Sequence, residues 1–127
     1  MNQRVGRMIS LEIGVENEGI GKEIGALMMG EPSPEPGSER AIAEGSVLRY
    51  LRAFKVLEPS GPTAPGVWVD FGITYDENAA ADAIVGWLLD TLGKHAGPVT
   101  LKVDTSEVPL ELEAMTTLVR RKVEQSL

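Results

Sequence analysis

The sequence predicts a single α+β domain over residues 1–127, with about three helices packed on a mainly antiparallel sheet of about five strands. Hydrophobic and polar residues alternate, as in half-buried strands, over residues 4–16, 48–58 and 67–75. Hydrophobic residues recur with the period of a helix over residues 18–29, 77–94 and 113–127. A chain of 127 residues is long enough to bury one core without disulfides.

The N-terminal part predicts a strand followed by a helix. Over residues 4–16 one side of the strand carries Val5, Ile9, Leu11, Ile13 and Val15. Residues 18–29 place Ile20, Ile24, Leu27 and Met28 on one helical face. Prolines then occupy every second position from Pro32 to Pro36, so residues 30–38 are expected to form a Pro-rich mobile loop within the domain.

Residues 39–52 are compatible with helix or strand. Ser38 is a possible N-cap for a short helix through Ala41 and Ile42. We favour this short helix, followed by a strand over residues 48–58 that carries Leu48, Tyr50, Phe54 and Val56 on one side. The Pro- and Gly-rich turn at 59–66 then predicts antiparallel pairing with residues 67–75.

Residues 67–75 alternate strictly, with a core face of Val67, Val69, Phe71, Ile73 and Tyr75. Asp70-Phe71-Gly72 matches the metal-binding triplet of protein kinases, but the chain lacks a His-Arg-Asp loop and is far too short for a kinase. We therefore expect a buried Phe71, an exposed Asp70, and a Gly72 that permits a bulge. Trp68 falls on the polar side of this strand, so either a helix or a partner is expected to cover it.

The predicted helix at 77–94 shows water only a narrow polar stripe: Asp82, Gly86, Asp90 and Lys94. Its start is assigned to a capping box of Thr74 and Glu77, with Asp76 as a competing N-cap. The apolar remainder, which includes Trp87, predicts that the helix lies across the sheet between other helices or meets a partner.

A hairpin and a helix complete the chain, in the order β-α-(α)-β-β-α-β-β-α. The hairpin is expected to set Val99, Leu101 and Val103 against Val108, Leu110 and Leu112. Pro109 has no N–H to donate, so its strand is expected to lie at an edge of the sheet or to turn Pro109 outward.

Composition and motifs argue against common catalytic and metal sites. The chain has no Cys and one His, which excludes thiol catalysis and the usual zinc sites. Gly19-Ile20-Gly21-Lys22 lacks the spacing of a phosphate loop, and the acids from Asp76 lack that of a calcium-binding EF-hand. His95 is expected to lie on the surface after a helix. We therefore predict a protein that is not an enzyme, with no catalytic, cofactor-binding or metal-binding residues.

Charge and hydropathy bear on the partners. The net charge of −7 disfavours nucleic acid and anionic lipid, because binding to both depends on Lys and Arg. No apolar run has the length of a membrane span, and none is typical of a signal peptide. With no Cys, a cytoplasmic location is expected. The predicted partner is another protein or a second copy, contacted through Trp68, Trp87 and the edge at Pro109.

Residues 67–127 carry a hydrophobic pattern that extends from Val67-Trp68-Val69-Asp70-Phe71, through Ala79–Leu92 with Trp87-Leu88, to Val99-Thr100-Leu101-Lys102-Val103. Together with the N-terminal strand and helix, this pattern resembles effector-associated constant component domains, which are small accessory domains of bacterial conflict systems. The resemblance implies a non-catalytic adaptor for a separately encoded effector, and it brings no catalytic residues to this chain.

The sequence is therefore compatible with three functions. The first is a protein-interaction or adaptor domain, with an acidic surface that selects a basic partner. The second is an acidic immunity protein that neutralises a toxin. The third is a small ligand-binding or hydrolase domain that uses the turn at 14–25 or His95.

Overall fold

The computed structural model describes residues 7–57 and 64–125. Val5, which the sequence placed in the first strand, lies outside these residues, as do residues 59–63 of the predicted turn. The elements, in chain order, are β1 (Met8–Val15), α1 (Glu18–Met29), β2 (Glu39–Ala43), β3 (Ser46–Lys55), β4 (Val67–Tyr75), α2 (Ala81–Leu92), β5 (Thr100–Val103), β6 (Ser106–Val108) and α3 (Leu112–Gln125).

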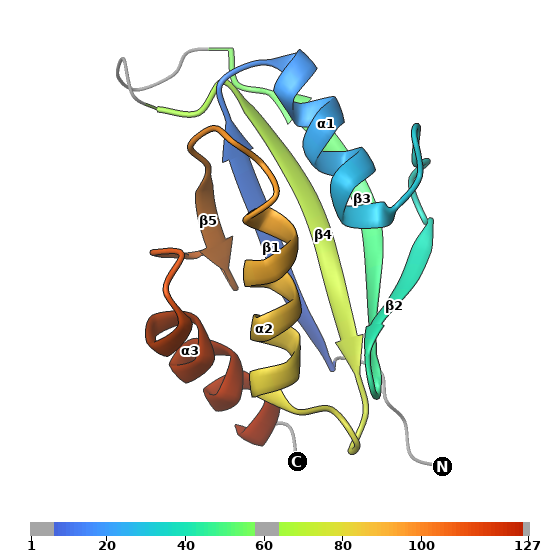
Figure 1. Ribbon diagram of the computed structural model, residues 1–127, viewed down its shortest axis with the longest axis vertical. Helices are drawn as coiled ribbons and strands as arrows, with labels where there is room; N and C mark the ends of the chain where they lie inside the picture. Colours follow the sequence, from blue (N-terminus) through green and yellow to red (C-terminus); the bar gives the residue numbers. More distant parts are fainter. Residues whose placement is uncertain (1–6, 58–63, 126–127) are drawn as a thin grey trace.

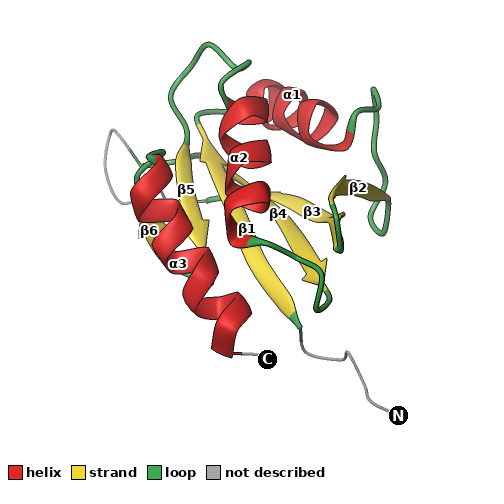
Figure 2. Cartoon of the chain, turned by 60° about the horizontal axis from the view of Figure 1, so that its bottom comes forward, coloured by secondary structure: helices red, strands yellow, loops and turns green. Residues whose placement is uncertain are grey.

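Within the described residues the strands form one six-stranded antiparallel sheet in the order β2-β3-β4-β1-β5-β6. The three helices all lie on the same face of this sheet (Figures 1 and 2). The predicted α+β class and single domain are confirmed, with one strand more than the expected five. None of the helices in the described part of the chain has the length and apolar character needed to span a bilayer.

The core lies between the helices and one face of the sheet. The alternating pattern is the reason, because it places every second side chain of β1 and β4 on the helix side. The largest fully buried side chains of the core are Ile9, Leu11, Ile13, Ile24, Met28, Leu48, Phe71, Ile73, Ile84, Leu88, Leu101 and Met115. The predicted core faces of residues 9–15 and 67–75 are confirmed.

The short helix predicted through Ala41 and Ile42 is wrong, because this segment is β2. β2 pairs with β3 across a tight turn at Gly45, where φ is +70°. Arg40 also anchors β2 to the helix layer, since its Nη1 donates to the carbonyl oxygen of Met28 at 2.8 Å. Hydrogen bonds to a neighbouring strand therefore outweigh the weak local preference of this segment for a helix.

A bulge in β3 changes the face on which its last residues lie. The register against β4 shifts between Tyr50 and Arg52, so Tyr50 lies opposite Phe71 but Phe54 lies opposite Trp68. The prediction that Tyr50 and Phe54 share a face is wrong. A bulge adds one residue to one strand only, and every later side chain then points to the opposite side.

The predicted start of the second helix is also wrong. α2 begins at Ala81, and its N-cap residue, Ala80, makes no side-chain capping bond. Asp76 instead accepts a hydrogen bond from the N–H of Asn78 at 2.8 Å, in a turn before the helix. α2 contacts both α1 and α3, which accounts for its narrow polar stripe without a partner.

The C-terminal hairpin is shorter than predicted. Asp104 and Thr105 form the tight turn with positive φ angles of 51° and 70°, so that Val103 pairs with Ser106. Leu110 and Leu112 consequently lie beyond β6, and Leu112 begins α3.

Candidate functional site

The sheet face opposite the helices is the candidate site, and we call it the open face. In the described part of the chain no helix lies over it (Figures 1 and 2). The strand registers place its central side chains in two neighbouring rows. An aromatic row holds Phe54, Trp68, Gly14 and Thr100, and a charged row holds Arg52, Asp70, Glu12, Lys102 and Glu107.

Trp68 lies on β4, one of the two central strands of the sheet, with its side chain on the open face. Gly14 lies directly opposite it in β1, and a Cβ atom built on Gly14 would come within 2.9 Å of Cζ3 of the Trp68 ring. The same Cβ would lie 2.6 Å from Cγ of Pro65, so both rings occupy the space above this glycine. Trp68 is therefore half-buried against its own sheet and presents part of its ring to solvent.

A positively charged side chain lies over each of the two aromatic rings of this row. The Nζ atom of Lys102 lies 4.7 Å from the ring centroid of Trp68, and the guanidinium carbon of Arg52 lies 5.0 Å from that of Phe54. Phe54 is 39% exposed. Cations over ring faces at these distances are attracted by the π electrons, which holds the long side chains in place beside the rings.

Asp70 departs from its predicted exposure, because it is only 9% exposed. Its Oδ2 atom accepts a hydrogen bond from Nε of Arg52 at 3.1 Å, while Oδ1 is buried without a partner among the described residues. Glu12 lies between Asp70 and Lys102 in the strand order. The sign of the charge therefore alternates along the charged row except at its centre, where the two acids Asp70 and Glu12 are neighbours.

Trp87 and Pro109, the other predicted contacts, lie on different surfaces. Trp87 is partly buried on α2, and the guanidinium carbon of Arg40 lies 5.4 Å from its ring centroid. Pro109 was predicted to lie within an edge strand; β6 is at the edge of the sheet, but it ends at Val108, so Pro109 lies just after it and is exposed. The structure therefore does not bring the three predicted residues together.

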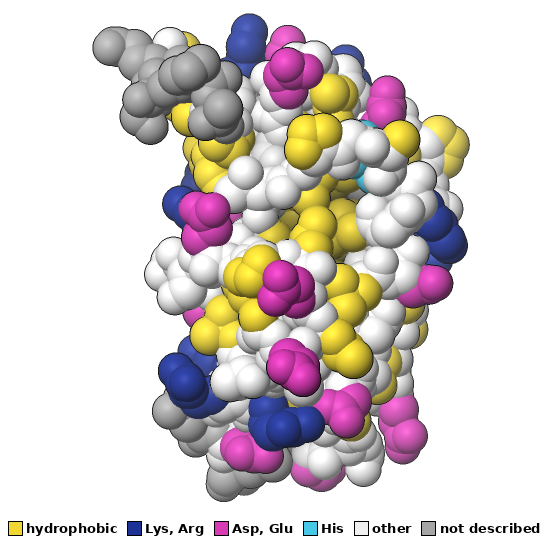
Figure 3. Space-filling model, turned by 60° about the vertical axis from the view of Figure 1, so that its left-hand side comes forward, with side chains coloured by type: hydrophobic (Ala, Val, Ile, Leu, Met, Phe, Trp, Pro, Cys, Tyr) yellow, Lys and Arg dark blue, Asp and Glu magenta, His cyan; other side chains and the backbone are white. Residues whose placement is uncertain are grey.

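Pro109 belongs to a shallow groove of about 510 Å³ beside β5 and β6. Hydrophobic side chains gather on the side of the molecule that carries β5 and α3 (Figure 3). The groove is lined by Val99, Thr100, Leu101, Glu107, Val108, Pro109 and Leu110.

The motifs with possible catalytic roles have structural positions in the fold. Gly19 to Lys22 lie in the first turns of α1, whose N-cap is Asn17, with its Oδ1 accepting from the N–H of Ile20 at 3.0 Å. His95 follows α2 and is partly buried, and its Nε2 atom is buried without a hydrogen-bond partner among the described residues. Among the described residues, no three His, Asp or Glu side chains are grouped so that they could hold a metal ion.

Comparison of the chain with protein-family models, with curated proteins and with solved structures found no match. Sequence reasoning found Trp68 but missed Phe54, because only the bulge in β3 brings Phe54 to the same face.

Proposed function

We propose that this protein is a non-catalytic protein-binding domain and that its contact surface is the open face. The observation that supports this most is the pairing of Phe54, 39% exposed, with half-buried Trp68 on a sheet face that no described helix covers. Aromatic residues and Arg are enriched at the centres of protein interfaces, where they contribute most of the binding energy.

The packing around Trp68 supports this role. Gly14, Pro65 and Lys102 hold the ring in one position before any partner arrives. A ring that is already ordered loses little conformational entropy on binding, which favours affinity. The charged row beside it combines three acids with two basic residues, so charge pairing would favour a partner with the complementary order of charges.

The partner we propose is a separately encoded effector protein of a bacterial conflict system, with this chain as its accessory component. This part of the proposal depends on the resemblance of residues 67–127 to effector-associated constant component domains. Binding is expected to bury Phe54 and the exposed part of Trp68, with no chemical step carried out by this chain.

The test is affinity capture from the native cell with the tagged protein and matched variants. Phe54→Ser removes an exposed ring from the open face, and Lys102→Glu reverses a charge beside Trp68. Leu112→Ser is the control, because Leu112 is 58% exposed but lies on α3, on the other side of the sheet. Thermal unfolding of each variant confirms that it is folded.

We expect one stoichiometric partner, with affinity reduced by about tenfold or more in both open-face variants and unchanged in Leu112→Ser. The identity of the partner then distinguishes an effector from a toxin. Equal capture by the wild type and both open-face variants would show that the open face is not the contact surface. Loss of capture in the Leu112→Ser control would lead to the same conclusion.

A further inference from the structure

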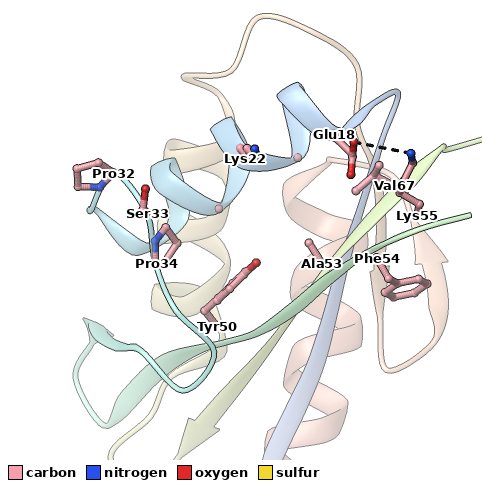
Figure 4. Close-up of a pocket in the computed structure, with 12 residues that line it drawn as sticks. Glu18, Lys22, Pro32, Ser33, Pro34, Tyr50, Ala53, Phe54, Lys55 and Val67 are labelled. Atoms are coloured by element: carbon pink, nitrogen blue, oxygen red, sulfur yellow. Dashed lines mark ion pairs between the residues drawn. The ribbon is translucent and has the colours of Figure 1, made fainter.

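A groove on the helix side of the sheet forms a second candidate site, separate from the open face. It has a volume of about 370 Å³ and lies between α1, the C-terminal half of β3 and the Pro-rich loop (Figure 4). This volume is in the range of small-molecule sites. Although Phe54 lines it in part, its ring points to the other side of β3 (Figure 4).

Two glycines on α1, one turn apart, line this groove. Gly21 packs closely on the sheet, because a Cβ there would lie 3.0 Å from Cγ1 of Val67, whereas Gly25 leaves open space beside it. A Cβ on Gly25 would lie 3.7 Å from Cγ of Pro34 and 3.8 Å from Cε1 of Tyr50, at ordinary contact distance. Glycine lowers helix stability by about 1 kcal/mol relative to alanine, so the open groove carries a cost in stability.

The Pro-rich loop is fixed as a wall of the groove by Tyr50. The N–H of Gly37 donates to the carbonyl oxygen of Tyr50 at 2.8 Å, and the N–H of Tyr50 donates to that of Ser38 at 2.9 Å. The ring of Tyr50 packs edge-on against Phe71, with the centroids 5.8 Å apart. Its hydroxyl group points into the groove (Figure 4), and no described residue hydrogen-bonds to it.

The charges that line the groove favour an anion. Glu18 pairs with Lys55 at 3.8 Å at one end, while Lys22 has no ion-pair partner among the described residues. Two lysines against one glutamate leave one net positive charge in a protein whose net charge is −7. The rest of the lining includes apolar Pro34, Tyr50 and Val67 surface, which suits a hydrophobic body.

The geometry points to a binding site for a small organic anion that has a carboxylate head and an apolar body. The carboxylate lies near Lys22 and accepts a hydrogen bond from the Tyr50 hydroxyl, and the body lies against Pro34 and the Tyr50 ring. This site does not depend on the open face, so the two proposals can fail independently.

Binding is measured with phenylacetate as the probe, in amide proton–nitrogen correlation spectra of the full chain. Phenylacetamide is the neutral probe of the same shape. We expect phenylacetate at millimolar concentration to shift the amide signals of Gly21 and Gly25. We expect phenylacetamide to bind about threefold to fivefold more weakly, as for the loss of one exposed charge interaction.

Gly25→Ala is the blocking variant, because its methyl group occupies the space between Pro34 and Tyr50 without a clash. It should abolish the shifts at Gly21, and Lys22→Gln should reduce phenylacetate binding to the level of phenylacetamide. Gly86→Ala is the control, because a Cβ there meets nothing within 4 Å on the exposed side of α2. The proposal is wrong if phenylacetate causes no shifts, if both probes bind equally, or if Gly25→Ala still binds.

Discussion

Gly14→Ala tests how Trp68 is seated on the open face. The structure places Gly14 beneath two rings, with Pro65 Cγ at 2.6 Å and Trp68 Cζ3 at 2.9 Å from the position of a Cβ atom. Carbon atoms in contact are about 3.5–4.0 Å apart, so both rings would have to move by about 1 Å. Neither ring has a flexible end that could give way, and Gly14 lies in β1, one of the two central strands.

The size of the effect follows from two opposing contributions. Overpacking by one methyl group costs about 1–3 kcal/mol. Replacing a glycine within a strand recovers about 0.5–1 kcal/mol, because the unfolded chain loses conformational freedom. We therefore expect Gly14→Ala to lower the free energy of unfolding by about 1–2 kcal/mol.

Urea unfolding followed by circular dichroism measures this change, and a double-mutant cycle assigns it to Trp68. In a Trp68→Ala background the substitution at Gly14 should cost less, with a coupling energy of about 0.5–1 kcal/mol between the two sites. Tryptophan emission in a Trp87→Phe background should also change with Gly14→Ala, because Trp68 is then the reporter. An unchanged unfolding midpoint, or a coupling energy of zero between the two sites, would show that Trp68 does not pack over Gly14.

Four further predictions follow from the local structure. Gly86→Ala should raise the free energy of unfolding by about 0.5–1 kcal/mol in urea denaturation, since its Cβ enters open space on α2. Gly45→Ala should lower the free energy of unfolding by about 2 kcal/mol, because φ at this position is +70° and the new Cβ overlaps Oδ1 of Asp76. Equal free energies of unfolding for Gly45→Ala and Gly86→Ala would contradict this. Arg40→Met should cost about 1–2 kcal/mol in thermal or urea unfolding, because α1 loses a charged donor to its C-terminal carbonyls, and unchanged stability would exclude this role. Burial raises the pKa of the Tyr50 phenol above its usual 10.0, so the folded protein holds this proton more tightly than the unfolded chain does. The resulting stability is present below about pH 10 and falls as the pH rises through the raised pKa, and urea unfolding at several pH values should show a smaller fall in Tyr50→Phe.

The hydrophobic pattern was sufficient to predict most of the elements near the core. The period-2 pattern identified β1 and β4 with the correct buried faces, and the helical period identified α1 with its exact bounds. Patterns of this kind can be recognised from short segments, because in an alternating strand the hydrophobicity of each residue indicates whether it faces the core. The segment that became β2 had no such pattern, since Ala41, Ile42 and Ala43 suit either a helix or a strand.

The candidate site was only partly predictable for the same reason. Trp68 stood out because a tryptophan on the polar side of a strand needs a cover, but the sequence did not say whether that cover was a helix or a partner. The structure shows that all three helices take the other face, which leaves Trp68 on the open face. Phe54 joined it only through the bulge at Tyr50 and Arg52.

By itself the sequence determined the fold class, the buried faces of β1 and β4, and the edge position of the strand next to Pro109. These properties depend on residue type and short-range spacing, which every segment carries along its own length. Only the tertiary structure decided that 39–43 is a strand, which face the helices cover, and how Phe54, Trp68 and Lys102 come together. Those outcomes depend on hydrogen bonds and packing between segments far apart in the chain, whose register one extra residue in β3 is enough to change.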